Sequence, residues 1–383
     1  MTIHGSSKDI KLIGDHMNQT NFIGRCLVII FIVYFSIACS SLGYRERNLR
    51  DSEITNKGGA TYMNPVFEPI LADPTVIKDP ETPYFYAYGT ADNWGDQRGE
   101  RLVSILQSKD LVHWKWIGTA FQKKPSWKAS GGIWAPDVVK VKNKYLLYYA
   151  FSTWGDPNPG IGVAVADRPV GPFLDQGKLF DSQEIQVPNS IDPHFFVDKG
   201  INYLFWGSFS DAHTQGTYGI PLTQDGLHVS DLQQKFKVAA GDFEAVMIHK
   251  RKGYYYFFGS KGSCCEGAKS TYHMMVGRSK KLQGPYYDKE GRDLKIRGAG
   301  TLLLQGNDHF VGTGHNSRII TDDNGIDWML YHGIDPKQSR VSSGGNRRVL
   351  LLDQIKWSAG WPVVENQTSS HMTNAAPFFK SIL

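Results

Sequence analysis

Four acidic residues and one histidine recur along the chain, each near the start of a short apolar segment: Asp73, Asp137, Asp192, Glu244 and His315. Successive members are separated by 64, 55, 52 and 71 positions. Like charges that lie close together raise each other's pKa, and burial disfavours the charged form. Gathering these side chains at one point would cost stability, so the cluster predicts acid–base chemistry, metal binding or both.

The elements that must position these residues follow from a fivefold repeat. Each of the five positions is followed by an aromatic segment, as in 84–89 and 254–259. Each interval has room for a four-stranded antiparallel sheet, and such sheets bury both faces when they stack radially. We therefore predict an all-β fold, a five-bladed β-propeller, with the five polar residues at one shared register of the innermost strands. A β-sandwich is the alternative, but it gives no reason for that register.

Composition and charge favour a β protein that does not bind nucleic acid. Aromatic residues make up 13% of the chain and there are 40 glycines, which suits short strands joined by tight turns. No long segment has apolar residues at helical spacing. Without residues 1–38 the chain has 39 basic and 35 acidic residues, a net charge of +4, and no basic run interleaved with aromatics. We expect no nucleic-acid partner, and a monomer.

Residues 1–38 have the pattern of a signal peptide. Basic residues precede an apolar run at 27–38, which is too short to span a bilayer, where roughly 20 residues are needed. Ala38 followed by Cys39 resembles a bacterial lipoprotein signal, in which Cys39 carries the lipid. An ordinary cleaved signal and an uncleaved anchor are the alternatives. Residues 39–60 are polar and charged, which is typical of a flexible tether.

These features predict an exported protein in the bacterial periplasm or on the outer membrane surface, attached to the membrane only through a lipid at Cys39. Apart from Cys26 in the signal and Cys39 at its end, the only cysteines are Cys264 and Cys265. Adjacent cysteines cannot form a disulfide framework, and they lack the spacing of a zinc site. A vicinal disulfide and two free thiols both remain open.

Short motifs follow one another in order between residues 62 and 365. They include Ala72-Asp73-Pro74, Trp134-Ala-Pro-Asp137, Ser190-Ile-Asp192-Pro193, Phe243-Glu244-Ala245, Ser263-Cys-Cys-Glu-Gly267, Gly312-Thr-Gly-His-Asn316 and Gly360-Trp-Pro362. In this order and spacing they resemble glycoside hydrolase family 43, and within it the endo-1,5-α-L-arabinanases. The resemblance implies a catalytic propeller over residues 61–366 and leaves 367–383 as a C-terminal tail.

The resemblance also implies inverting hydrolysis by three carboxyl groups. Asp73 matches the general base that activates water, and Glu244 matches the general acid that protonates the leaving oxygen. Asp192 matches the carboxylate that raises the pKa of the acid and orients it. Asp-Pro is also a common way to begin a strand after a turn, so Asp73 and Asp192 taken singly are ambiguous.

Two further members of the repeat have other expected roles. Asp137 is expected to contact substrate or to serve the structure. His315 resembles the axial histidine near which family members hold a metal, usually calcium and largely through water. Calcium prefers oxygen ligands, so one histidine does not define such a site. A neutral histidine hydrogen-bonded within the funnel is the alternative.

Flat apolar side chains beside the funnel are expected to contact sugar, and the candidates are Trp94, Trp134, Trp154 and Phe209. The rim segment 208–219 departs from the connection typical of endo-arabinanases. The cleavage mode on arabinan therefore stays open between endo and exo. An exo-acting α-L-arabinofuranosidase or β-xylosidase is the main alternative, followed by a sugar-binding propeller without catalysis.

Overall fold

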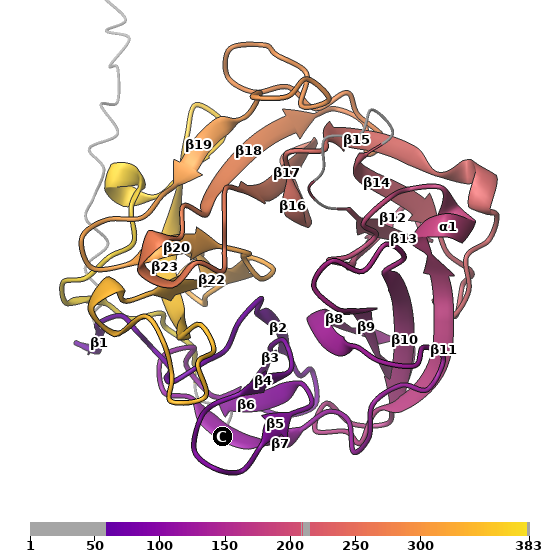
Figure 1. The fold of residues 1–383 in the computed structure, drawn as a ribbon. Helices are drawn as coiled ribbons and strands as arrows, with labels where there is room; N and C mark the ends of the chain where they lie inside the picture. Colours follow the sequence, from indigo (N-terminus) through magenta and orange to yellow (C-terminus); the bar gives the residue numbers. More distant parts are fainter. Residues whose placement is uncertain (1–58, 208, 210–214, 381–383) are drawn as a thin grey trace, which may run out of the picture. The chain divides into compact units, whose positions relative to one another are not determined.

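The chain divides into residues 1–53 and residues 54–383, and only the second unit contains residues that the computed structural model describes: 59–207, 209 and 215–380. Most of the described strands form five antiparallel sheets around one axis, with the first strand of each sheet nearest the centre, and two further pairs of short strands lie outside these sheets (Figure 1). The prediction of an all-β, five-bladed propeller is confirmed.

Each blade contains four successive strands in a meander, and the fifth has an additional short strand. The first blade comprises β2 (Thr75–Lys78), β3 (Phe85–Tyr88), β6 (Ser104–Ser108) and β7 (Lys115–Thr119). The second comprises β8 (Gly132–Val141), β9 (Lys144–Ser152), β10 (Gly160–Ala166) and β11 (Leu174–Asp181). The third comprises β12 (His194–Asp198), β13 (Ile201–Trp206), β14 (Gly216–Pro221) and β15 (Phe236–Ala240).

The fourth blade comprises β16 (Glu244–Arg251), β17 (Tyr254–Lys261), β18 (His273–Ser279) and β19 (Thr301–Leu304). The fifth comprises β20 (Val311–Gly314), β22 (Asp327–Ile334), β23 (Arg348–Ser358) and β24 (Trp361–Val363), with β21 (Ile320–Thr321) paired to β22. The connections hold β4 (Asp92–Asn93), β5 (Glu100–Arg101), the helix α1 (Ser182–Ile185) and four 3-10 turns, η1 (Leu232–Gln234), η2 (Gly267–Lys269), η3 (Pro336–Gln338) and η4 (Glu365–Gln367).

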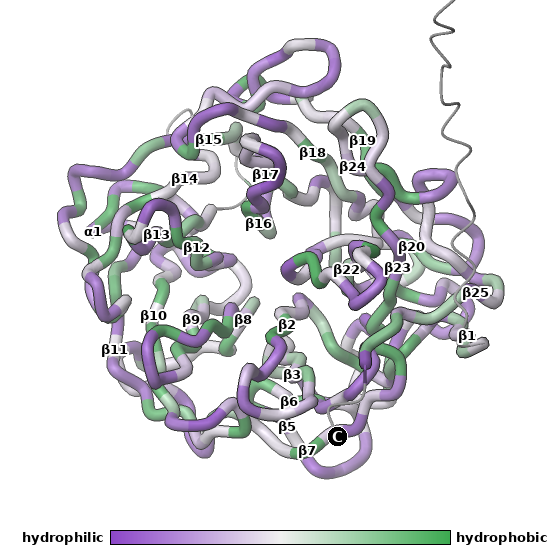
Figure 2. The backbone as a smooth tube through the Cα atoms, turned by 180° about the vertical axis from the view of Figure 1, so that it is seen from behind, coloured by the Kyte–Doolittle hydropathy of each residue, from purple (hydrophilic) through white to green (hydrophobic). Residues whose placement is uncertain are grey.

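Apolar clusters fill the interface between every pair of neighbouring blades. Consecutive residues of one strand face opposite interfaces: Val138 packs toward the first blade and Val139 toward the third. Side chains alternate across a strand, so a blade covered on both faces needs apolar residues at consecutive positions. This explains apolar runs such as 145–151. Hydrophilic residues are frequent on the outer loops (Figure 2).

The two ends of the described chain close the ring together at the fifth blade. Residues 66–71 form backbone hydrogen bonds of 2.9–3.0 Å with residues 348–350 of β23. Beside them, β1 (Thr61–Tyr62) pairs with β25 (Asn374–Ala375), which lies in the segment expected to be a tail. Segments far apart in sequence thus complete the interface between the fifth and first blades, which closes the ring of blades.

The predicted signal peptide, Cys39, which is expected to carry a lipid, and nearly all of the tether lie outside the described residues. Within the described part of the chain, no helix has the length and apolar character needed to cross a membrane.

Replacing Asn64 by Ala tests the closure. Its side-chain amide donates to the Leu352 carbonyl (3.0 Å) and to Ser370 Oγ (3.0 Å), and accepts from the Leu352 amide (2.9 Å). We expect the free energy of unfolding in urea to fall by about 1–3 kcal/mol, because buried partners lose their hydrogen bonds. Asn374→Ala, which removes only an exposed bond to the Met372 carbonyl, is the control and should change little. Equal effects from both variants would contradict this account of closure.

Candidate active site

A cavity of roughly 700 Å³ opens on the axis and receives residues from all five blades. The predicted catalytic residues Asp73, Asp192 and Glu244 line it together with His315. Asp137 is absent from the lining. The inner strands therefore bring four of the five repeated residues to one place.

The five repeated residues do not share one register. The backbone enters the left-handed region once in each inner segment, with φ between 44° and 56°, at Asp73, Ala135, Asp192, Ala245 and His315. Glu244 lies one position before this point and Asp137 two positions after it. The expectation of a common register is therefore wrong for these two residues. Bulges between Glu244 and Met247 and between Trp134 and Asp137 accompany the offsets.

In four of the five blades the left-handed residue joins its blade to the one before it. In the first, second, fourth and fifth blades its backbone N–H donates to a side chain of the preceding blade. These bonds run from Asp73 N to His332 Nδ1 (3.0 Å), Ala135 N to Thr90 Oγ1 (2.8 Å), Ala245 N to Asp192 Oδ2 (3.0 Å) and His315 N to Ser260 Oγ (3.0 Å). Non-glycine residues in this region cost free energy, and such strain is concentrated at functional sites.

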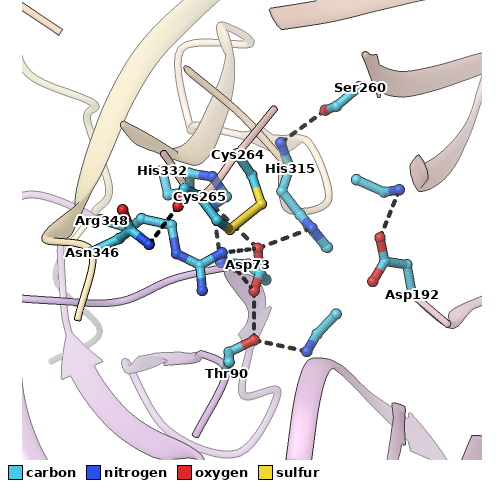
Figure 3. Close-up of polar contacts among 12 residues, drawn as sticks. Asp73, Thr90, Asp192, Ser260, Cys264, Cys265, His315, His332, Asn346 and Arg348 are labelled. Carbon is cyan, nitrogen blue, oxygen red and sulfur yellow. Dashed lines mark hydrogen bonds and ion pairs between the residues drawn. A yellow bond between two sulfur atoms is a disulfide. The ribbon is translucent and has the colours of Figure 1, made fainter. Parts of the chain in front are cut away.

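Asp73 is held as an anion by its neighbours (Figure 3). Arg348 Nη1 donates to both carboxylate oxygens (2.9 and 3.0 Å), Thr90 Oγ1 donates to Oδ2 (2.6 Å), and His315 Nδ1 lies 3.3 Å from Oδ1. Burial raises the pKa of Asp73, but the positive charges of Arg348 and His315 outweigh it, and the pKa ends well below its usual value. His332 accepts the Asp73 amide through Nδ1, and burial lowers its pKa, so it is neutral.

Asp192 and Glu244 are linked through one peptide group. Asp192 Oδ2 accepts the N–H of Ala245, the residue that follows Glu244, so Asp192 fixes the backbone that carries Glu244. Burial raises the pKa of Asp192 to about 6, with His315 lowering it and Asp73 raising it. Burial, the charges of Glu244 and Asp192, and a hydrogen bond with Glu244 raise the pKa of Tyr272 well above normal.

The model of glycosyl hydrolases family 43 matches residues 62–362, most of the chain. The chain belongs to glycosyl hydrolase family 43. It is 33% identical over 307 residues to the extracellular endo-α-(1→5)-L-arabinanase 1 of Bacillus subtilis, covering 76% of this chain and 87% of the relative. It is 31% identical over 319 residues to the extracellular exo-α-(1→5)-L-arabinofuranosidase ArbA of Cellvibrio japonicus, covering 77% and 86%.

Among solved structures, the chain is similar to an α-L-arabinanase of Cellvibrio cellulosa complexed with arabinohexaose, with a TM-score of 0.65 and 30% identity. That similarity covers 78% of this chain and 97% of the other. The resemblance seen in the sequence is confirmed at the level of the family, and the protein is a glycoside hydrolase.

Three of the four candidate aromatic residues lie at the cavity of this family 43 enzyme. Trp134, Trp154 and Phe209 line it, and the two indoles pack with ring centroids 5.7 Å apart. Trp154 is 80% exposed, so its face is free for a ligand. Trp94 does not line the cavity: it packs against Phe67 and Trp116. The structure thus gives Trp94 a packing environment rather than a place at the cavity.

Asp137 is buried and engaged by protein groups on every side. Arg318 forms a two-point ion pair with it, with Nη2 at 2.6 Å from Oδ2, and the Phe195 amide (2.6 Å) and Thr75 hydroxyl (2.9 Å) also donate to it. These contacts tie four blades together. Of the two roles expected from sequence, the structure places Asp137 in the structural one.

His315 lies beside Asp73, and its pKa is raised: burial lowers it, but the charges of Asp73, Asp192 and Glu244 outweigh that effect. Among the residues that the structure describes, no three His, Cys, Asp or Glu side chains are grouped to hold a metal ion. The side chains do not form a calcium cage by themselves, so we assign no chemical step to an ion.

Sequence reasoning did not select several cavity residues. Arg348 begins β23 and has no counterpart in the repeat, so no sequence signal marked it. Asp92 lies 3.9 Å from Arg348, and burial raises its pKa to about 7. Thr90 was detectable in principle, because Thr90 and Ser260 are both hydroxyl residues near the ends of aromatic strands. Cys264 and Cys265, whose state was open, form a disulfide at the cavity wall.

Asp192→Asn separates stability from activity. The pKa of Asp192 is raised to about 6 in the folded protein, above its value in the unfolded chain. As the pH rises from the unfolded pKa to 6 and beyond, ionisation of Asp192 therefore lowers the stability of the folded state. We expect the variant to unfold at higher urea than the parent at pH 7.5, to lose this gain toward pH 4, and to lose most activity. Asp198→Asn is the control, and it should change the stability in the opposite direction. Burial raises the pKa of Asp198, but its partner Lys250 helps to lower it overall, so this variant should unfold at lower urea than the parent at pH 7.5. If Asp192→Asn were less stable than the parent at pH 7.5, this would contradict the raised pKa of Asp192 in the folded protein.

Proposed function

We propose that the chain is an exported, inverting, endo-acting hydrolase of α-1,5-L-arabinan. The observation that carries the proposal is the meeting of Asp73, Asp192 and Glu244 in one cavity of a family 43 propeller. The names of similar proteins, both endo-arabinanase and exo-arabinofuranosidase, support an α-1,5-arabinan substrate. Their description as extracellular supports export.

Asp73 acts as the general base in this proposal. Its carboxylate stays ionised because of Arg348 and His315, so it can accept the proton of a water molecule that attacks the anomeric carbon. The bonds from Arg348 and Thr90 fix its orientation. One cost of this arrangement is a low basicity, which the fixed geometry of the attacking water offsets.

Glu244 acts as the general acid and protonates the leaving glycosidic oxygen. Asp192 supports it in two ways: its charge disfavours ionisation of a nearby carboxyl group, and its bond to the Ala245 amide holds the backbone beside Glu244. In an inverting enzyme the base and the acid act from opposite faces of the sugar, with room for water between them.

The cleavage mode depends on the rim of the cavity. Trp154 and Phe209 offer apolar faces for sugar rings beyond the cleaved bond, as an endo-acting enzyme needs. Half of the departing segment 208–219 lies outside the described residues, at 208 and 210–214. The similarity to an exo-acting enzyme makes exo cleavage the alternative outcome. The lipid anchor at Cys39 and the monomeric state stay parts of the proposal.

Glu244→Gln tests the substrate and the acid together. The parent should release a ladder of arabino-oligosaccharides from debranched linear arabinan, and the variant should lower kcat by about 10²–10⁴-fold, because the leaving oxygen is no longer protonated. Chromatography of the products over time is the measurement. Glu365→Gln, at an exposed surface pair with Lys356, is the matched control and should act like the parent.

Arabinose as the sole product would establish exo cleavage instead. Release only from xylo-oligosaccharides or aryl furanosides would keep the hydrolytic mechanism and reject arabinan. Binding of arabinan with no hydrolysis of any glycoside would support the non-catalytic alternative.

Calcium near His315 is tested by removing metal. If calcium binds there, chelation with EDTA should lower both the thermal midpoint and kcat/KM, and calcium should restore both. His315→Gln should abolish this response while the chain stays folded, because the only proposed contact is lost. Isothermal titration of the chelated protein with CaCl₂ measures the affinity. No heat of binding and no response to EDTA would reject calcium as a cofactor.

A further inference from the structure

The Cys264–Cys265 disulfide lies in the connection between β17 and η2 and lines the catalytic cavity. It joins two adjacent residues, whose Cα atoms are 3.8 Å apart. A disulfide stabilises a fold mainly by closing a long loop in the unfolded chain, and the effect grows with the length of that loop. No residue lies between the two cysteines, so this bond closes almost no loop and stabilises the fold little in this way. Its position at the cavity wall therefore calls for another explanation.

The disulfide is fixed relative to the fifth blade. Asn346, which also lines the cavity, donates through Nδ2 to the Cys265 carbonyl (3.0 Å) and accepts the Gly267 amide through Oδ1 (2.8 Å). The base of the loop is pinned by Ser263, whose carbonyl accepts the amides of Thr271 (2.9 Å) and Tyr272 (3.0 Å). A rigid loop thus presents the two sulfurs to the cavity.

The wall of the cavity combines aromatic, charged and polar side chains. The second and third blades contribute Trp134, Trp154 and Phe209 together with polar residues such as Asn189, while the first and fifth contribute charged groups such as Asp92 and Arg348. The fourth blade contributes both the disulfide and Glu244. Disulfide sulfurs are polarizable and have no strong hydrogen-bonding group, so they form an apolar surface.

We propose that the Cys264–Cys265 disulfide is a sugar-binding face of the cleft, against which the C–H groups of an arabinofuranose unit pack. This inference rests on the proposed function for its ligand. The intact disulfide closes a small ring through the two adjacent cysteines, and this ring holds both sulfurs in one place. A dithiol such as dithiothreitol transfers two electrons and two protons to it, becoming a cyclic disulfide and leaving two thiols that rotate independently. Reduction therefore removes the fixed surface without removing an atom of the catalytic carboxyl groups.

Binding of linear arabinohexaose, measured by isothermal titration, tests the inference. Glu244→Gln serves as the parent, so that the ligand is not consumed. Adding Cys264→Ser and Cys265→Ser, or treating the parent with dithiothreitol, should raise Kd about tenfold, the lower end of the effect of one missing methylene in an apolar pocket. Reoxidation of the reduced parent should restore the affinity. Dithiothreitol should not affect the double-serine protein, which controls for other actions of the reagent.

The thermal midpoint, followed in the same samples, distinguishes lost contact from lost folding. A weaker Kd with a nearly unchanged midpoint and full recovery on reoxidation supports the inference. Equal Kd for the oxidised, reduced and double-serine proteins overturns it and leaves the proposed function intact. If the parent is folded but does not bind arabinohexaose, both the proposed substrate and this inference are overturned.

Discussion

In four of the five blades, the backbone amide at the entrance to the inner strand donates a hydrogen bond to a side chain of the preceding blade. This bond connects the architecture of the protein to its chemistry. The segment bends into the left-handed region at that point, and the bend turns the neighbouring side chains toward the axis. Where the residue at the bend is Asp73 or Asp192, its own carboxyl group enters the cavity. At the fourth blade the bend falls on Ala245, and Glu244 just before it is the residue presented. A left-handed bend thus lies at, or directly after, each of the three carboxyl residues.

The same hydrogen bonds make the site a product of neighbouring blades rather than of single ones. The acceptor for Ala245 is the carboxylate of Asp192, so a structural link between two blades is also a link between two groups of the site. His332 plays the corresponding part for Asp73. Movement of one blade against another would therefore disturb the chemistry directly. The apolar clusters at every blade interface, and the closure of the ring by both chain ends, oppose such movement.

Electrostatics gives the buried carboxyl groups different pKa values. All of them are disfavoured as anions by burial, yet Asp73 has Arg348, His315 and Thr90 as partners while Asp192 has only one backbone donor among its recorded hydrogen bonds. The pKa values consequently diverge, well below normal for Asp73 and to about 6 for Asp192. Asp137 pairs with Arg318 and does not line the cavity. Similar residues in similar strands thus serve different purposes because their partners differ.

The sequence by itself determined the repeat and the propeller, and it predicted the three carboxyl residues that line the cavity, because strand periodicity, aromatic segments and motif order are local properties of the chain. It also marked Trp134, Trp154 and Phe209. Tertiary structure alone decided the true register, because a bulge shifts side chains by a position without changing the local pattern. It likewise decided that Asp137 and Trp94 pack within the protein and that Arg348 reaches Asp73 across 275 positions. Such contacts depend on how the ring closes, which no local pattern encodes.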